Sequence, residues 1–156
     1  MQIIRYEEYS AIGDLPVSFQ QLIREAKKIS KTAYAPYSKF LVGAAALLEN
    51  GKIVLGSNQE NASFPAGLCG ESVALFAAGA NYPKIPIKAI AITASSKKKK
   101  VTEPIAPCGI CRQVFVEFEN RQKKDIVIIL MGDRGKIRLI RSAKELLPLA
   151  FEAKYL

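Results

Sequence analysis

The chain contains no histidine and no tryptophan, and it has only three cysteines in 156 residues. The absence of histidine excludes Ser-His-Asp and Cys-His catalysis, together with every metal site that needs a histidine ligand. The cysteines, Cys69, Cys108 and Cys111, are odd in number and cannot all pair within one chain. Because the sequence carries no export signal, these thiols indicate a metal site or a catalytic role and not a disulfide framework.

Long apolar segments are absent as well. The longest apolar runs, such as Ile126–Met131, are far shorter than the roughly 20 residues that cross a bilayer. The N-terminal residues Met1–Glu8 lack the charged-then-apolar layout of a signal peptide. We therefore expect a cytoplasmic protein with no membrane partner.

The formal net charge is +9, which permits weak attraction to nucleic acid. The basic residues are nevertheless scattered, and only Lys97–Lys100 forms a run. This run has no aromatic neighbours on which bases would stack, so a solvated loop is favoured over a phosphate-contacting patch. We expect no nucleic-acid partner.

The length of 156 residues suits one domain with one hydrophobic core. The sequence has no internal repeat and no linker, so we interpret residues 1–156 as a single domain with an N-terminal extension at residues 1–16. In chain order, the patterns predict helix 15–26, strands 41–48 and 52–55, helix 69–80, strand 87–94, helix 109–118, strands 125–131 and 136–140, and a short helix that begins after Ser142 and ends at Pro148. Asp14 is a candidate N-cap of the first helix.

Two turns determine how the predicted strands pair. Asn50-Gly51 between two apolar runs is a strong hairpin signal, which makes the flanking strands antiparallel. The turn Gly132–Gly135 is too short for a parallel crossover, so the last two strands are also antiparallel. We therefore predict an α/β protein of three layers, α/β/α, built on a mixed five-stranded sheet.

The cysteines begin two of the predicted helices. Cys69 stands at the start of one, and Cys108 and Cys111 lie three residues apart on one face of the first turn of the other. Helix N-termini stabilise thiolates. Three thiolates can hold one Zn²⁺ and leave its fourth position for water, as in catalytic zinc sites. The alternative is that they are three buried cysteines that act as small apolar groups.

The net charge of such a zinc site determines how much help it needs to activate water. A Zn²⁺ ion with three thiolates totals −1 and is a weaker Lewis acid than a histidine-ligated ion. Glu71, two residues after Cys69, is the candidate base and proton shuttle. Arg112, next to Cys111, is the candidate for electrostatic support, although it also suits the surface of a helix.

These residues resemble the zinc-dependent cytidine deaminase family in its small homotetrameric form. The resemblance runs from about Tyr34 to Phe151. It implies that Glu71 is catalytic and that the three cysteines are the zinc ligands. The substrate contacts that it implies are Phe40 beside the pyrimidine, Asn58 and Glu60 on a ribose hydroxyl, and Phe151 reaching an active site in a neighbouring subunit.

The resemblance further implies an enzyme of pyrimidine salvage with one Zn²⁺ per chain, a homotetramer with shared active sites. The implied reaction is hydrolytic deamination of cytidine and 2′-deoxycytidine to uridine and 2′-deoxyuridine, with release of ammonia. The chain departs from the family at two places: Cys69-Gly70-Glu71-Ser72 stands where Cys-Ala-Glu-Arg is usual, and Phe64 replaces a usual Tyr. The alternatives are a deaminase of another aminopyrimidine nucleoside, such as a blasticidin-type antibiotic, and a zinc-stabilised basic RNA-binding module.

Overall fold

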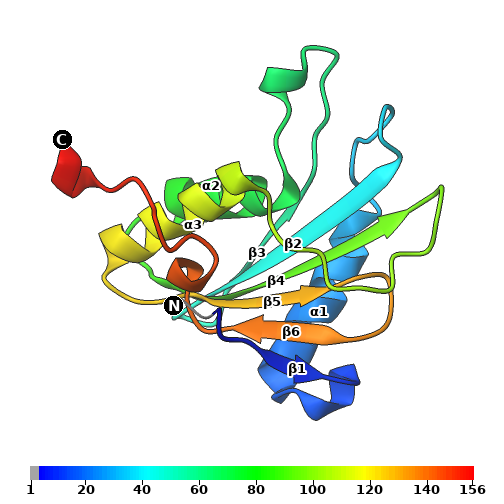
Figure 1. Ribbon diagram of the computed structural model, residues 1–156, viewed down its shortest axis with the longest axis horizontal. Coiled ribbons are helices and arrows are strands. Elements are labelled where there is room, and N and C mark those ends of the chain that lie inside the picture. The colour runs from blue at the N-terminus through cyan, green and yellow to red at the C-terminus, as the bar shows by residue number, and fades with distance from the viewer. Residues whose placement is uncertain (1–3) are drawn as a thin grey trace.

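The computed structural model describes residues 4–156. Its regular elements are the helices α1 (Val17–Ser30), α2 (Gly70–Asn81) and α3 (Gly109–Gln122) and the strands β1 (Glu7–Tyr9), β2 (Phe40–Leu48), β3 (Ile53–Ser57), β4 (Ile87–Ser96), β5 (Val127–Met131) and β6 (Ile137–Ile140). The strands form one sheet in the order β1-β6-β5-β4-β2-β3 (Figure 1). Only β4 and β5 run parallel, and all other neighbours are antiparallel. None of the helices in the described residues is long and apolar enough to cross a membrane.

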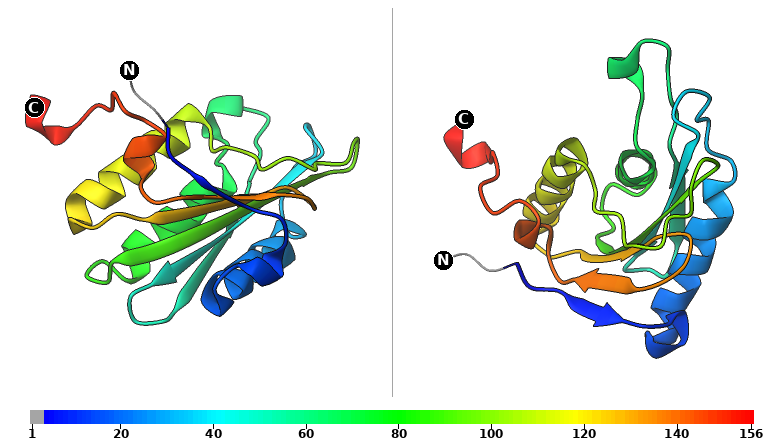
Figure 2. Two further views of the ribbon diagram at one scale, coloured as in Figure 1. Left: turned by 60° about the horizontal axis from the view of Figure 1, so that its bottom comes forward. Right: turned by 45° about the vertical axis from the view of Figure 1, so that its right-hand side comes forward.

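The sheet separates two helical layers. Helix α1 covers one face, and α2 and α3 lie side by side on the other (Figure 2). Successive side chains of a strand point to opposite faces. On β4, accordingly, Ala89 and Ala91 pack toward α1, whereas Ile90 and Ile92 pack toward α2 and α3. The predicted three-layer α/β/α arrangement is confirmed.

Helix α1 lies very close to its face of the sheet. A Cβ atom added to Gly43 on β2 would lie 2.0 Å from the Ala26 carbonyl oxygen of α1. Glycine is therefore required where this helix crosses the strand. Gly56 on β3 has the same role on the other face, where an added Cβ atom would lie 2.4 Å from the Ala74 nitrogen of α2.

The sheet has six strands and not five, which corrects the prediction. The additional strand, β1, pairs antiparallel with β6 at the edge of the sheet and lies inside the predicted N-terminal extension. Its three residues, Glu-Glu-Tyr, are too few and too polar to show an apolar alternation. The pairing is accompanied by ion pairs from Glu8 to Lys136 and from Glu7 to Arg141, each 2.6 Å long.

The helix ends also differ from their predicted positions. Pro16 occupies the N-cap of α1, whereas Asp14 accepts a hydrogen bond from the Ala11 N–H at 3.0 Å within the preceding 3-10 turn. Helix α3 continues beyond Phe118 and stops where Lys123 adopts a left-handed φ of 54°. The segment after Ser142 is a 3-10 turn, Ala143–Glu145.

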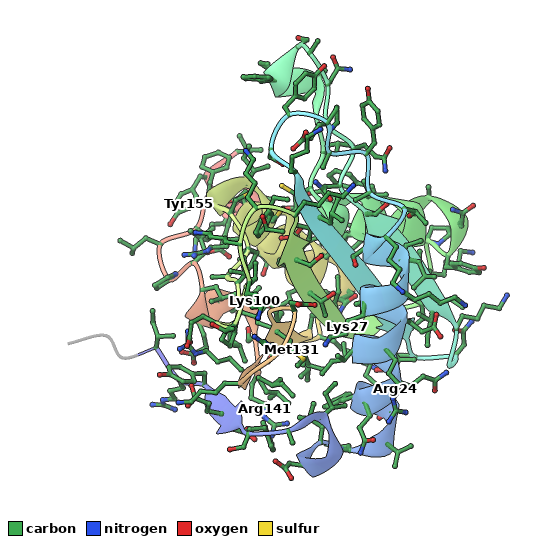
Figure 3. The ribbon with its side chains drawn as sticks, turned by 90° about the vertical axis from the view of Figure 1, so that its right-hand side faces the viewer. Arg24, Lys27, Lys100, Met131, Arg141 and Tyr155 are labelled. Carbon is green, nitrogen blue, oxygen red and sulfur yellow. The ribbon has the colours of Figure 1, made fainter. Side chains whose placement is uncertain are left out.

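The basic side chains lie on separate elements, as the sequence indicates. Figure 3 shows Arg24 and Lys27 on α1, Lys100 in the loop after β4 and Arg141 after β6, spread over this side of the molecule. Lys27 donates a hydrogen bond to the Asp133 carbonyl at 2.6 Å, and Arg141 is paired with Glu7. These residues do not form one continuous stripe.

Candidate active site

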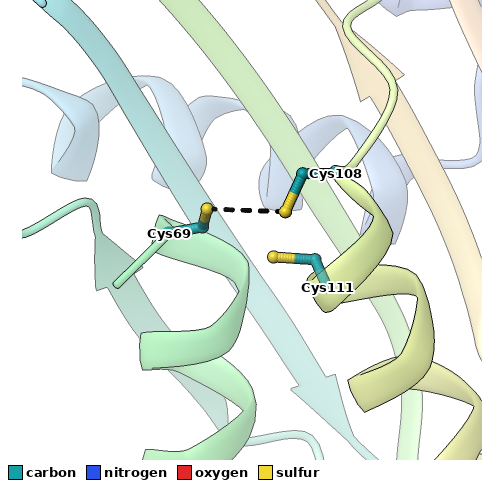
Figure 4. A group of neighbouring side chains, drawn as sticks. All are labelled: Cys69, Cys108 and Cys111. Atoms are coloured by element: carbon teal, nitrogen blue, oxygen red, sulfur yellow. Dashed lines mark hydrogen bonds between the residues drawn. The ribbon is translucent and has the colours of Figure 1, made fainter. Parts of the chain in front are cut away.

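The three cysteines converge where α2 and α3 begin (Figure 4). Cys69 is the N-cap residue of α2, Cys108 is the N-cap residue of α3, and Cys111 lies in the first turn of α3. The Sγ atoms of Cys69 and Cys108 are 3.8 Å apart, and all three Sγ atoms lie within 4.8 Å of one another. In residues 4–156, these are the one group of three or more potential metal-ligating side chains brought this close together.

The donor set fits zinc. Ligands on a tetrahedral ion with Zn–S bonds of about 2.3 Å are separated by about 3.8 Å, which is the spacing of Cys69 and Cys108. The positive ends of two helices face the sulfur atoms and favour their thiolate forms. Three protein ligands leave one position for water, as in catalytic rather than structural zinc sites.

The thiols also interact with one another. The nearby Cys111 thiol lowers the pKa of Cys69 to about 7, and the same interaction raises the pKa of Cys111, which is buried. One thiol therefore ionises readily while its neighbour keeps its proton. A divalent metal ion must displace that proton to bind all three thiolates, so metal binding releases protons.

Glu71 lies beside this cluster in the first turn of α2. It is 5% exposed, and its Oε2 atom has no hydrogen-bond partner in the described structure. Burial raises the pKa of Glu71 and outweighs the opposing hydrogen bonds from its own backbone N–H and the Cys111 thiol. A carboxyl group whose pKa is raised binds a proton more tightly than an exposed one, which suits a general acid–base catalyst.

A cavity of about 790 Å³ opens over Glu71, Cys69 and Cys108. Its other walls come from the start of β2 and from the loops after α1, β3 and β4. The lining residues in these walls are Tyr37, Ser38, Phe40, Val42, Asn58, Gln59, Glu60, Asn61, Phe64, Gly67, Leu68, Ile105 and Ala106. The structure thus brings six predicted site residues together: Glu71, Cys69, Cys108, Phe40, Asn58 and Glu60 all line this cavity.

Asn58 and Glu60 are fixed by the backbone of the cavity wall. The Asn58 amide oxygen accepts from the Val42 N–H at 2.8 Å, and its NH₂ group donates to the Phe40 carbonyl at 3.0 Å. Glu60 accepts from the Tyr37 N–H at 2.9 Å and from the Ser38 hydroxyl. The Ser38 hydroxyl is the main cause of the lowered pKa of Glu60, which keeps this half-buried carboxylate ionised at the cavity rim.

Arg112 and Phe151 lie outside the cavity wall. The Arg112 guanidinium donates to the Pro107 carbonyl at 2.8 Å and to the Leu146 carbonyl at 3.2 Å. It therefore braces the Pro107-Cys108 turn against the C-terminal segment. Phe151 is 60% exposed, and its backbone exchanges hydrogen bonds with the Gln113 side chain at 2.7 and 3.3 Å.

Sequence reasoning missed several residues of this site. Ile105 and Ala106 line the cavity just before Pro107, and Leu68 lines it just before Cys69. Their proximity to the cysteines in sequence was a usable signal. Tyr37 and Phe64 form an edge-to-face pair across the rim, with ring centroids 5.9 Å apart. No local pattern predicts this pair because it joins two separate loops.

Three thiols and a buried carboxyl group, whose Oε2 atom has no partner in the described structure, meet at two helix N-termini on one face of a mixed sheet. This combination defines a zinc-dependent hydrolase of the deaminase class. Residues 17–129 match the family described as "Cytidine and deoxycytidylate deaminase zinc-binding region". The chain belongs to this family, and its cofactor is zinc.

Individual relatives agree with this assignment. The chain is 41% identical to a cytidine deaminase from Halalkalibacterium halodurans over 86% of its own length and 95% of the relative. It is 34% identical to a probable cytidine deaminase from Dictyostelium discoideum over 83% of its own length and 80% of the relative. A crystal structure of cytidine deaminase from Burkholderia pseudomallei superposes with a TM-score of 0.72 and 42% identity, covering 84% of this chain and 97% of that one. The predicted family and α/β fold are thus confirmed.

Proposed function

We propose that this protein catalyses the zinc-dependent hydrolytic deamination of cytidine and 2′-deoxycytidine to uridine and 2′-deoxyuridine, with release of ammonia. The observation that carries the proposal is the position of Glu71. Its buried carboxyl group, whose Oε2 atom has no partner in the described structure, lies beside three converging thiols and lines a cavity large enough for a nucleoside. The cytidine deaminase names of its relatives supply the substrate class.

Cys69, Cys108 and Cys111 would hold the zinc. When bound, the ion acidifies a coordinated water and so supplies the nucleophile for C4 of the pyrimidine. Glu71 would take the proton released in this step and deliver it to the ring nitrogen N3. It would then take the proton of the hydroxyl group added at C4, as the carbonyl forms, and give it to the departing amine, which leaves as ammonia. Its raised pKa suits both halves of this shuttle, because burial destabilises the ionised form and makes it a stronger base.

The remaining wall residues orient the substrate. The Phe40 ring packs beside the pyrimidine, while Asn58 and Glu60 hold a ribose hydroxyl. Ionised Glu60 accepts a hydrogen bond from a neutral sugar but repels a phosphate in the same place. We therefore propose a free nucleoside, rather than a nucleotide or a polynucleotide, as the substrate.

A nucleoside panel tests this function. Purified zinc-loaded protein is incubated with cytidine, deoxycytidine, deoxycytidine monophosphate, a blasticidin-type nucleoside and a cytidine-containing RNA, and deamination is followed by absorbance. We expect turnover of the first two, loss of turnover after zinc is chelated, and recovery after zinc is restored. Preferential turnover of the blasticidin-type compound would instead support the alternative enzyme, and RNA binding without turnover would support the basic binding module.

We also propose a homotetramer in which Phe151 completes the active site of a neighbouring subunit. Phe151 does not line the cavity of its own chain, and Ile110, Leu149 and Leu156 are further exposed apolar residues near the same face or on the same tail. Light scattering should give a tetramer. Phe151→Ala should raise KM while the zinc content stays unchanged, and a fully active monomer would contradict the proposal.

Arg112 supports the cysteine cluster through its positive charge, since its hydrogen bonds go to carbonyl groups and not to sulfur.

We place the enzyme in the cytoplasm, in pyrimidine salvage, because a trithiol zinc site needs a reducing compartment to stay reduced. Fractionation of the native cell with an antibody against the protein tests the location.

A further inference from the structure

Ser72 lies in the first turn of α2, directly after Glu71, and is 2% exposed. Its Oγ atom is 3.3 Å from the Sγ atom of Cys111, which is itself fully buried. We propose that Ser72 is a positioning residue that donates its hydroxyl proton to the Cys111 thiolate and thereby sets the donor strength of this zinc ligand. The inference rests on the proposed zinc ligands.

The direction of the hydrogen bond follows from the chemistry of the cluster. Zinc binds cysteine as the thiolate, which has no proton to give. In the metal-bound protein, the Ser72 hydroxyl is therefore the donor and the Cys111 sulfur the acceptor. An ionised Glu71 carboxylate cannot replace it, because a carboxylate only accepts.

No other side chain performs this task in the part of the chain that the structure describes. Outside the cysteines themselves, the Ser72 hydroxyl is the one side-chain donor within hydrogen-bonding distance of a cluster sulfur. Arg112 directs its guanidinium to the Pro107 and Leu146 carbonyls instead. Cys111 has no exposed surface, so water does not solvate its sulfur.

The consequence for zinc follows from the net charge of −1 on an ion with three thiolates. A hydrogen bond to a thiolate stabilises the sulfur lone pairs, so the sulfur donates less charge to the metal. The ion then remains a better Lewis acid toward its water ligand. The same hydrogen bond restricts rotation of the Cys111 side chain and directs its sulfur toward Cys69 and Cys108.

Cobalt substitution tests the proposal without using activity. Co²⁺ is loaded into the wild type, into Ser72→Ala and into Thr93→Val, and the sulfur-to-cobalt charge-transfer bands are recorded in the near ultraviolet. Thr93 is a matched control because it is also 2% exposed but its hydroxyl has no hydrogen-bond partner in the described structure and lies on the α1 face of the sheet. Alanine is well tolerated in helices, so the fold of Ser72→Ala should be retained.

We expect the bands of Ser72→Ala to move to lower energy, because an unsolvated thiolate gives up an electron more easily. Competition with a chromophoric chelator at fixed pH should show zinc affinity reduced about 10- to 100-fold, as for other residues that support metal ligands. Thr93→Val should match the wild type in both measurements. Unchanged bands and unchanged affinity in Ser72→Ala would overturn the proposal, as would a lower melting temperature alone.

The experiment separates failure of this inference from failure of the proposed function. If wild-type protein showed no sulfur-to-cobalt bands at all, the proposed ligands would be wrong, and the role of Ser72 with them. If the wild type showed the bands and Ser72→Ala left them in place, only the role of Ser72 would be wrong.

Discussion

Two buried glutamates on neighbouring helices have opposite surroundings. Glu119 near the end of α3 is 1% exposed and accepts hydrogen bonds of 2.8 Å from the Ile126 N–H, the Ala143 N–H and the Ser142 hydroxyl. Glu71 at the start of α2 is 5% exposed, yet its Oε2 atom has no partner in the described structure. Both carboxyl groups are hidden from water, and only one is satisfied by the protein.

The difference separates a structural carboxylate from the one that we propose to be catalytic. Glu119 joins α3 to the start of β5 and to the 3-10 turn at Ala143–Glu145, so its hydrogen bonds are used to hold the fold. The Oε2 atom of Glu71 has no such partner and can exchange a proton with a ligand in the cavity. Native proteins satisfy most buried polar groups, and an exception indicates a catalytic role, a bound water or a bound ion. Substitution of these two residues should therefore affect different properties of the protein.

The largest effect is expected for Glu71→Gln on turnover. Glutamine has nearly the same size but cannot carry a proton. General acid–base catalysis contributes about 10²- to 10⁴-fold. In the proposed mechanism Glu71 serves in more than one proton transfer, so kcat should fall by about 10⁴-fold or more. Zinc content should remain near one per chain. Retention of more than about a tenth of wild-type kcat would show that Glu71 is not the shuttle.

Glu119→Ala should have the opposite effect: the free energy of unfolding should fall while kcat stays unchanged. The Ile126 and Ala143 N–H groups are fully buried and would lose their acceptor, and each unsatisfied group costs about 1–3 kcal/mol. We expect the free energy of unfolding to fall by about 3–5 kcal/mol in denaturant titrations at fixed protein concentration. Glu119→Gln, which keeps one acceptor oxygen, is the matched control and should lose less. The kcat of the folded fraction should not change in either variant.

A third expectation concerns metal-free protein as the pH changes. Burial raises the pKa of Glu71, so the folded state binds this proton more tightly than the unfolded state does. The fold therefore loses stability as the pH rises from the unfolded value of about 4.5 through the folded pKa. Glu71→Gln removes this loss. Its melting temperature relative to wild type should increase as the pH rises above about 4.5, and a difference that stays flat or decreases would contradict the role of burial.

The sequence predicted the local features well. Asn50-Gly51 forms the expected turn between β2 and β3, with Gly51 at a φ of +84°, because its conformation is a property of two adjacent residues. The cysteines begin the helices α2 and α3 as their spacing indicated. These elements contain their own signals in the form of a turn dipeptide, a helix start or an apolar period.

The features that were missed depend on residues far apart in sequence. Glu119 owes its role to N–H groups 7 and 24 residues further along the chain. The hydrogen bond from Arg112 to a carbonyl 34 residues away, which braces the C-terminal segment, could not be predicted either. Strand β1 exists because β6 offers it a partner 130 residues later. Such contacts become visible only once the chain is folded.

The smallest predicted effect is that of Ser142→Ala, and it tests whether Glu119 acts as part of a network. The Ser142 hydroxyl donates to the second Glu119 oxygen at 2.8 Å, and it accepts from the Lys144 N–H at 3.3 Å as the N-cap of the 3-10 turn. The variant removes this cap but leaves both buried N–H groups bound to Glu119. We therefore expect a loss of about 1 kcal/mol, the usual value for an N-cap serine, in the same denaturant titration.

The double variant Ser142→Ala with Glu119→Ala distinguishes a network from independent contacts. If Ser142 stabilises the fold mainly through Glu119, its removal should cost much less once Glu119 is gone, and the two losses should not add. Zinc content and KM should match wild type for Ser142→Ala alone, because the Leu146 carbonyl that holds Arg112 is kept in place by the rest of the turn. Full additivity would show that Ser142 acts only as a local cap, and that the buried N–H groups alone determine the structural role of Glu119.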